Sequence, residues 1–96
     1  MSFGIIHRFP GGTKEQYDNT VKVVHPDGGA KLPEGQSLHV AGTTDSGFLV
    51  FAIHDSKATW ESFRDNTLVP GLATVENGLP GPPEEIEFEV YKVQTD

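Results

Sequence analysis

The stretch GFLVFAIHDSKATWESFRDNTLVPGL, residues 47–72, joins an apolar run directly to an amphipathic segment, and the fold can be worked out from it. Residues 48–53 are apolar without alternation, which is typical of a strand covered on both faces. Asp55 and Ser56 are good helix caps, and Trp60 and Phe63 follow them at helical spacing. We therefore expect a central buried strand that runs into a helix packed against it.

The same helix contains Pro70, which lacks a backbone donor and clashes with the turn before it. We therefore expect one helical segment to end near Asn66 and a second to begin one or two residues later, with Pro70 in its opening turn. Thr67 should continue the inner face of the helix. The Asn-Gly pair at residues 77–78 should end it.

Three more segments have the character of strands. Residues 3–9, FGIIHRF, carry apolar side chains on both strand faces, and residues 37–41, SLHVA, alternate. A turn over residues 42–47 should join the second of these to the central strand as an antiparallel hairpin. Residues 86–90, IEFEV, alternate apolar and acidic side chains, which predicts an edge strand with one buried face and one exposed face.

A second helix and a loop lie between the first two strands. Thr13 followed three residues later by Gln16 is a capping box, and the helix that it opens should run to about His25. Residues 27–36 are rich in turn formers and predict a loop. The element order is therefore βαββαβ. Two right-handed crossovers then predict an α+β, ferredoxin-like sheet of four antiparallel strands with both helices on one face.

The composition limits the size and the partners of the protein. Residues 1–96 are enough for a single domain with one modest core. The formal net charge is -7 and the basic residues are scattered, so we expect no nucleic-acid partner. No run is long enough to cross a bilayer, and the N-terminus lacks the features of a signal peptide. Because the chain also has no cysteine, we expect a cytoplasmic protein with no membrane partner.

The apolar pattern also predicts a dimer. Two helices cover one face of a four-stranded sheet, yet residues 3–9 and 48–53 carry apolar side chains on both strand faces. Leaving about six such side chains in water would forfeit on the order of 1.5 to 3 kcal/mol each, comparable in sum to the net stability of a domain. We therefore expect two copies of the chain to pair through their open sheet faces about a two-fold axis.

Four segments together resemble one superfamily. They are FGIIHRF (3–9), GGTKEQYD (11–18), LPEGQSLHVAG (32–42) and FLVFAIHDSKATWESFRDNTLVPGL (48–72). In these segments, in its length and in its element order, the chain resembles the dimeric α+β barrel proteins, which include monooxygenases of the antibiotic-biosynthesis type. The resemblance covers nearly the whole chain. It implies a homodimer whose two sheets close a barrel, with a pocket in each protomer between sheet and helices.

The histidines raise the question of a metal site. They are His7, His25, His39 and His54. Their spacing contains neither H-x-x-x-H nor H-x-H, and the chain has no cysteine, so it matches no metal motif. We expect no metal site, and histidines that make ordinary hydrogen bonds or face solvent.

A small-molecule pocket is the better interpretation of the polar residues. Apolar walls with a few polar groups describe a ligand cleft, and a histidine in it has a pKa suited to moving a proton. We predict His7 and His39 as the catalytic groups. The predicted substrate-binding residues are Tyr17, Phe51, Trp60, Phe63 and Arg64. The alternative is that the aromatic side chains only fill the core and Arg64 is solvated.

The pocket and the resemblance together imply a cofactor-independent enzyme of the monooxygenase-like type, acting on a small aromatic or polyketide-like molecule. Isomerases and cyclases in the superfamily are the other enzyme possibilities. We expect no cofactor: haem-degrading relatives have a histidine later in the helical region, and none follows His54 here. A glycine-rich nucleotide loop is also absent. The alternatives are a non-catalytic dimer that binds a small apolar ligand and a stress-related dimer with no occupied pocket.

Overall fold

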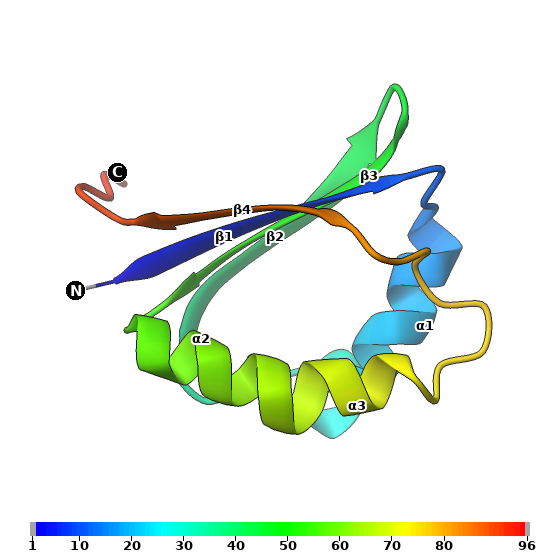
Figure 1. Cartoon of the computed structure of the whole chain (residues 1–96), viewed down its shortest axis with the longest axis horizontal. Helices are drawn as coiled ribbons and strands as arrows, with labels where there is room; N and C mark the ends of the chain where they lie inside the picture. Colours follow the sequence, from blue (N-terminus) through cyan, green and yellow to red (C-terminus); the bar gives the residue numbers. More distant parts are fainter. Residues whose placement is uncertain (1, 96) are drawn as a thin grey trace.

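The structure, a computed structural model, describes residues 2–95 as one antiparallel sheet with its helices on one face (Figure 1). The strands are β1 (Phe3–Pro10), β2 (Gln36–Thr44), β3 (Gly47–His54) and β4 (Glu84–Glu89), in the spatial order β2-β3-β1-β4. The helical segments are α1 (Lys14–Val24), the 3₁₀ turn η1 (Asp27–Gly29), α2 (Lys57–Phe63), the π segment η2 (Arg64–Leu68) and α3 (Val69–Leu72). The predicted α+β, ferredoxin-like fold is confirmed.

Helix α1 begins as the sequence predicts. The Thr13 hydroxyl accepts a hydrogen bond from the backbone N–H of Gln16 at 3.1 Å, and the Gln16 side-chain oxygen accepts one from the backbone N–H of Thr13 at 2.9 Å. These two bonds pair donors that would otherwise be left free in the first turn. The helix ends at Val24, and the N–H of His25 still bonds to the carbonyl of Val21.

The hairpin between β2 and β3 is tighter than predicted. The expected turn over residues 42–47 is wrong, because β2 continues to Thr44 and only Asp45 and Ser46 lie between the strands. Thr43 pairs with Phe48 across the hairpin. Threonine is β-branched and favours extended backbone, which explains why the strand continues where glycine and polar residues suggested a turn.

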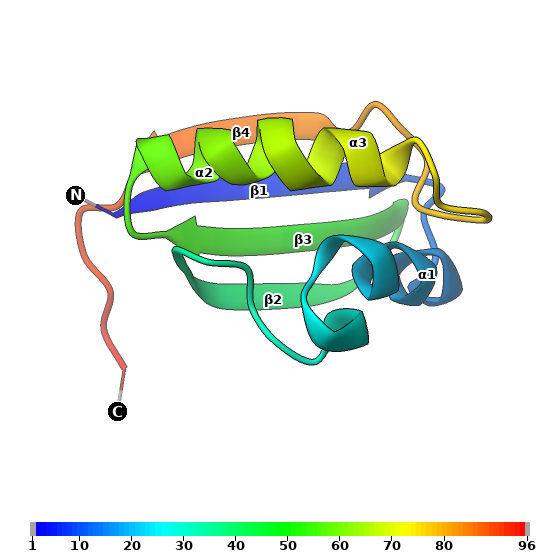
Figure 2. The same ribbon diagram turned by 90° about the horizontal axis from the view of Figure 1, so that it is seen from below.

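The sequence predicts that Pro70 interrupts the helix, but the structure shows no interruption. Instead α2, η2 and α3 form one continuous rod along the sheet (Figure 2), and Pro70 lies in the opening turn of α3. In η2 the N–H of Val69 bonds to the carbonyl of Arg64, five residues back. A π turn holds one extra residue, so it accommodates a proline that a regular helix would not.

The extra residue also changes which side chains face the sheet. Thr67, predicted on the inner face, is exposed, whereas Leu68 is half-buried and packs against the core formed by Phe3, Ile5 and Trp60. The predicted helix end at residues 77–78 is also wrong, because α3 stops at Leu72. Gly71 directly follows Pro70, and these two residues give this last segment a low helix propensity.

The sheet face away from the helices is apolar and uncovered in a single chain. Its cross-strand rows follow from the strand register. One row is Val40, Phe51, Ile6 and Ile86, and the next is Leu38, Ile53, Gly4 and Phe88. We call these two rows the open face. Val40 is 49% exposed and Ile86 is 51% exposed. A monomer would leave this patch in water.

The last strand, β4, lies at the sheet edge as predicted, but its exposure differs from the prediction. All six residues are exposed, including Ile86 and Phe88, which were expected to be buried. The register places these apolar side chains on the open face, so the alternate residues Glu85 and Glu87 lie on the face that the helices cover. Within residues 2–95, no helix combines the length and apolarity needed to cross a bilayer.

Candidate functional site

A cavity of about 200 Å³ lies between the sheet and the helices. Its walls come from all four strands, α1, the α2–α3 rod and the segment before β4, and most of them are apolar. Valine and leucine side chains of α1 and α3 face Ile5, Val50 and Ala52 of the sheet across it. Two groups of polar side chains interrupt these apolar walls, one on β1 and β4 and the other on α1 and β2.

The first polar group is an imidazole–carboxylate pair. His7 on β1 and Glu85 on β4 are directly opposite in the strand register, and His7 Nε2 lies 2.6 Å from Glu85 Oε2. Both residues line the cavity, and the His7 side chain is only 12% exposed. The indole ring of Trp60 lies beside the His7 ring, with 5.7 Å between the ring centroids. The strand pairing and the indole together fix the orientation of His7.

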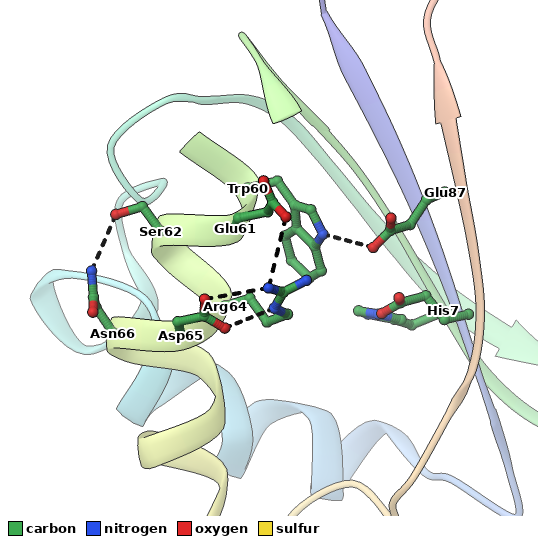
Figure 3. Close-up of polar contacts among 9 residues, drawn as sticks. His7, Trp60, Glu61, Ser62, Arg64, Asp65, Asn66 and Glu87 are labelled. Carbon is green, nitrogen blue, oxygen red and sulfur yellow. Dashed lines mark hydrogen bonds and ion pairs between the residues drawn. The ribbon is translucent and has the colours of Figure 1, made fainter. Parts of the chain in front are cut away.

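Trp60 and Arg64 form the helical side of this group (Figure 3). Trp60 Nε1 donates a hydrogen bond to Glu87 Oε2 at 2.9 Å, and this bond lowers the pKa of the Glu87 carboxyl. Arg64 Nε donates to Asp65 Oδ1 at 2.8 Å, and its guanidinium lies 3.9 Å from Glu61. Arg64 therefore lines the cavity with much of its hydrogen-bonding capacity already used.

The second polar group is a hydrogen-bonded chain of four side chains. Tyr17 Oη lies 2.6 Å from His39 Nε2, and His39 Nδ1 lies 2.9 Å from Gln36 Oε1. The Gln36 Nε2 group lies 3.1 Å from Nε2 of His54, which is fully buried. We call these residues the Tyr17 chain. Tyr17, His39 and Gln36 line the cavity.

A bulge in β2 assembles the Tyr17 chain. Gln36 pairs with His54 and Leu38 pairs with Ile53, so one extra residue, Ser37, is inserted in β2. Without the bulge, residues 36 and 39 would point to opposite faces of the strand, because side chains alternate. The bulge brings Gln36 and His39 to the same face, where their side chains meet.

Burial keeps the Tyr17 chain uncharged at neutral pH. Burial, together with the nearby His25, lowers the pKa of His39 to about 4. The ring centroids of His25 and His39 are 4.6 Å apart, and burial lowers the pKa of His25 as well. Burial and the charge of Asp18 raise the pKa of Tyr17. This end of the cavity is therefore polar but neutral.

We expect the folded state to lose stability as the pH falls from 6.5 towards 4. In this window the unfolded chain protonates His25, His39 and His54, whose pKa values are all lowered in the folded protein, so the unfolded state binds more protons. His39 alone should contribute on the order of 2 kcal/mol after allowance for its partial exposure. Urea unfolding at a series of pH values measures the slope. The His39→Phe variant should show a shallower slope, and an unchanged slope would contradict this assignment.

The structure brings most of the predicted site residues to the cavity. They are His7, His39, Tyr17, Trp60, Phe63 and Arg64. Phe51 is the exception: it lies on the open face, where its ring stacks with Phe88 at 6.3 Å between centroids. Inward positions along β3 differ by two in residue number, so Phe51, between the inward residues Val50 and Ala52, points to the other face.

Sequence reasoning missed Glu85, Gln36 and His25. Glu85 has no sequence signal, because an alternating strand between two apolar layers can direct either set of side chains inward. The turn-forming residues around Gln36 predict a loop, and only the bulge in β2 brings Gln36 to the site. Within residues 2–95, no group of three His, Asp or Glu side chains is arranged to hold a metal ion.

The comparisons with known proteins support the architecture. No protein-family model matches the chain, and no curated protein matches it. A solved structure that is similar is that of Rv0793 from Mycobacterium tuberculosis, with a TM-score of 0.68 and 14% sequence identity. The match covers 99% of this chain and 100% of that chain. At this identity the likeness shows the fold alone, so activity has to be argued from the site.

Proposed function

We propose that the chain is a small-molecule enzyme in which His7, held by Glu85, moves a proton to or from an aromatic substrate. The observation that supports this most directly is the 2.6 Å pair of His7 Nε2 and Glu85 Oε2 in the wall of an apolar cavity. The carboxylate balances the charge that the imidazole gains when it takes a proton. Because Nε2 is used for Glu85, the ring's other nitrogen is the one offered to a substrate.

His7 is better suited to this role than His39, the other predicted catalytic residue. Both ring nitrogens of His39 are engaged, one by Tyr17 and the other by Gln36. With a pKa of about 4, His39 is also a weak base at neutral pH. We therefore assign His39 to holding Tyr17, and proton transfer to His7.

The size of the cavity narrows the substrate class. An apolar cavity of about 150 Å³ is enough to bind benzene, so about 200 Å³ suits a molecule of one or two rings. A phenol or a dihydroxylated two-ring aromatic fits this space and has an acidic proton. A larger polyketide of several rings does not.

Cofactor-independent oxygenation is the reaction that the resemblance favours. Removal of a proton from a hydroxylated aromatic leaves an electron-rich anion, which reacts with dioxygen as the oxidant. One oxygen atom becomes a ring carbonyl of the quinone product, and the other leaves as water with the two hydrogens that the substrate loses. Isomerases and cyclases begin with the same proton transfer, so the His7–Glu85 pair serves all three. Oxygen uptake is the measurement that separates oxygenation from the other two reactions.

Hydrogen exchange into 1,3-dihydroxynaphthalene tests the proton transfer. The ring hydrogens of this compound exchange with D2O through its keto tautomer, and we expect the protein to accelerate the exchange seen by NMR. His7→Gln should lower the accelerated rate about 100-fold or more, and Glu85→Gln about tenfold. Glu89→Gln is the matched control, because Glu89 lies on the same face of β4 but does not line the cavity.

The variants decide the assignment. Exchange by His7→Gln at the rate of the unchanged protein would remove His7 from the mechanism. Oxygen consumption recorded in the same samples would support the monooxygenase reaction, whereas exchange without oxygen consumption would favour an isomerase.

A non-catalytic ligand carrier is the second candidate. It is favoured by the largely apolar walls and by the internal partners that Tyr17 and Arg64 already have. Native mass spectrometry of the purified protein distinguishes the two functions. A carrier should retain an unchanged small molecule, whereas an enzyme should release its product.

We also propose that two copies pair through the open face. The apolar rows across all four strands, with Val40 and Ile86 about half exposed, support a homodimer because monomers seldom leave such a patch in water. Pairing two of these sheets face to face would bury both patches and leave each cavity on the outer, helical side of its own sheet.

A further inference from the structure

The polar end of the cavity that the proposed reaction does not use is the Tyr17 chain. Tyr17 lines the cavity, and its hydroxyl has one proton and two oxygen lone pairs. What Tyr17 offers to a ligand therefore depends on where that one proton points. The hydrogen bonds behind Tyr17 determine this.

The short distance from Tyr17 Oη to His39 Nε2 favours the hydroxyl as the donor. At 2.6 Å it is shorter than the roughly 2.9 Å typical of an N–H donor and falls in the range of O–H donors. A phenol is also a stronger acid than a neutral imidazole, which is the better acceptor. The Tyr17 proton is therefore directed to His39 and not into the cavity.

The placement of the Gln36 amide corresponds to the same direction. Its Oε1 is an acceptor only, so the His39 Nδ1 at 2.9 Å carries the proton of the neutral ring and donates it. That leaves His39 Nε2 as an acceptor, which matches the short bond from Tyr17. The other end of the amide, Nε2, then donates to His54 Nε2, which places the His54 proton on Nδ1, a buried atom without a hydrogen-bond partner among residues 2–95. Gln36 thus fixes the tautomer of His39.

We propose that the cavity recognises an uncharged aromatic ligand through a hydroxyl that donates a hydrogen bond to Tyr17 Oη, and that Gln36 determines this polarity through His39. The proposal rests on the proposed small-molecule function and specifies its ligand. With its proton committed to His39, Tyr17 accepts a hydrogen bond at no cost but has no proton to give. A ketone or a methyl ether at this position would leave Tyr17 facing another acceptor.

A matched pair of probes tests this polarity in the 96-residue chain. p-Cresol and 4-methylanisole have the same ring and differ in one methyl group on the oxygen, and both are small enough for the cavity. Titration of the ¹⁵N-labelled protein, followed by NMR, gives both dissociation constants. We expect p-cresol to bind about tenfold more tightly, the ratio that one good hydrogen bond provides.

Gln36→Met is the decisive variant. Methionine has nearly the same length but no hydrogen-bonding amide, so His39 is free to adopt its other tautomer and donate to Tyr17. The Tyr17 proton is then available to the ligand, and the preference for p-cresol should fall to about threefold or less. An unchanged preference in this variant would remove Gln36 from the proposal.

The remaining outcomes separate this proposal from the proposed function. Equal affinities for the two probes would overturn the polarity and leave the cavity as an aromatic site. Binding of neither probe would overturn the small-molecule function itself. Should Gln36→Met fail to fold, ¹⁵N NMR of the unchanged protein reports the His39 tautomer. The proposal requires the proton on Nδ1, and a proton on Nε2 would overturn it.

Discussion

Replacing Val40 with aspartate should convert the proposed dimer into a monomer. Val40 lies on the open face, in the row that crosses all four strands through Phe51, Ile6 and Ile86. In a two-fold interface each substitution introduces two charges, and burying a charge without a partner costs several kcal/mol. We expect the dimer dissociation constant to rise by about 1,000-fold or more. Sedimentation velocity at micromolar concentration measures the change.

The chain provides a closely matched control in Val23→Asp. Val23 on α1 is 47% exposed, against 49% for Val40, but it lies on the helical side of the protein. A valine-to-aspartate change at residue 23 alters the charge and the side-chain volume by the same amounts as Val40→Asp, but it does not touch the open face. Val23→Asp should remain dimeric. A monomer before any substitution, or dissociation by both variants alike, would show that the open face is not the interface.

Gly47→Ala should strongly destabilise the folded chain. Gly47 begins β3 opposite Pro10, and a Cβ atom at this position would overlap the Phe9 carbonyl oxygen and lie 2.6 Å from the Gly11 backbone nitrogen. These obstacles are backbone atoms at the end of β1 and in the turn that follows it, so they have less room to move than a flexible side chain. We expect a loss of roughly 3 kcal/mol or more, a large share of the stability of a small domain. The midpoint of urea unfolding measures it.

Gly42→Ala separates this steric effect from the general effect of removing a glycine. Gly42 lies in β2, and no atom is within 4 Å of a Cβ atom built there. Alanine restricts the unfolded chain more than glycine does, so this variant should be as stable as the unchanged protein or slightly more stable. A loss at Gly42 equal to that at Gly47 would contradict the proposed backbone overlap.

Sequence periodicity predicted the fold correctly wherever local rules and tertiary packing agree. The capping box at Thr13 and Gln16 starts α1, and the cap at Ser56 starts α2 with the side chain of Ser56 accepting from the N–H of Thr59. The unbroken apolar run of β3 was enough to identify it as a central strand. These signals depend on residues close together in the chain, so they can be recognised from the sequence alone.

The parts of the site that could not be predicted depend on one-residue shifts. The bulge at Ser37 turns Gln36 to the inner face, and the parity of β4 turns Glu85 inward instead of Ile86. Phe51 was assigned to the wrong face for the same reason. A strand's period is two, so a shift by one residue exchanges the two faces. Composition and spacing contain no signal that fixes such a shift.

The surplus residue in η2 marks where the length of the rod can vary without moving its cavity-facing side chains. A π turn takes up one extra residue in about one turn, so Leu68, Val69 and Leu72 point where they would after a regular turn one residue shorter. The same one-residue deletion within α2, where the winding is regular, would rotate everything after it by about 100° about the rod and turn these side chains away from the cavity. A relative that lacks one residue in the segment 64–68 would therefore enclose the same space under the sheet.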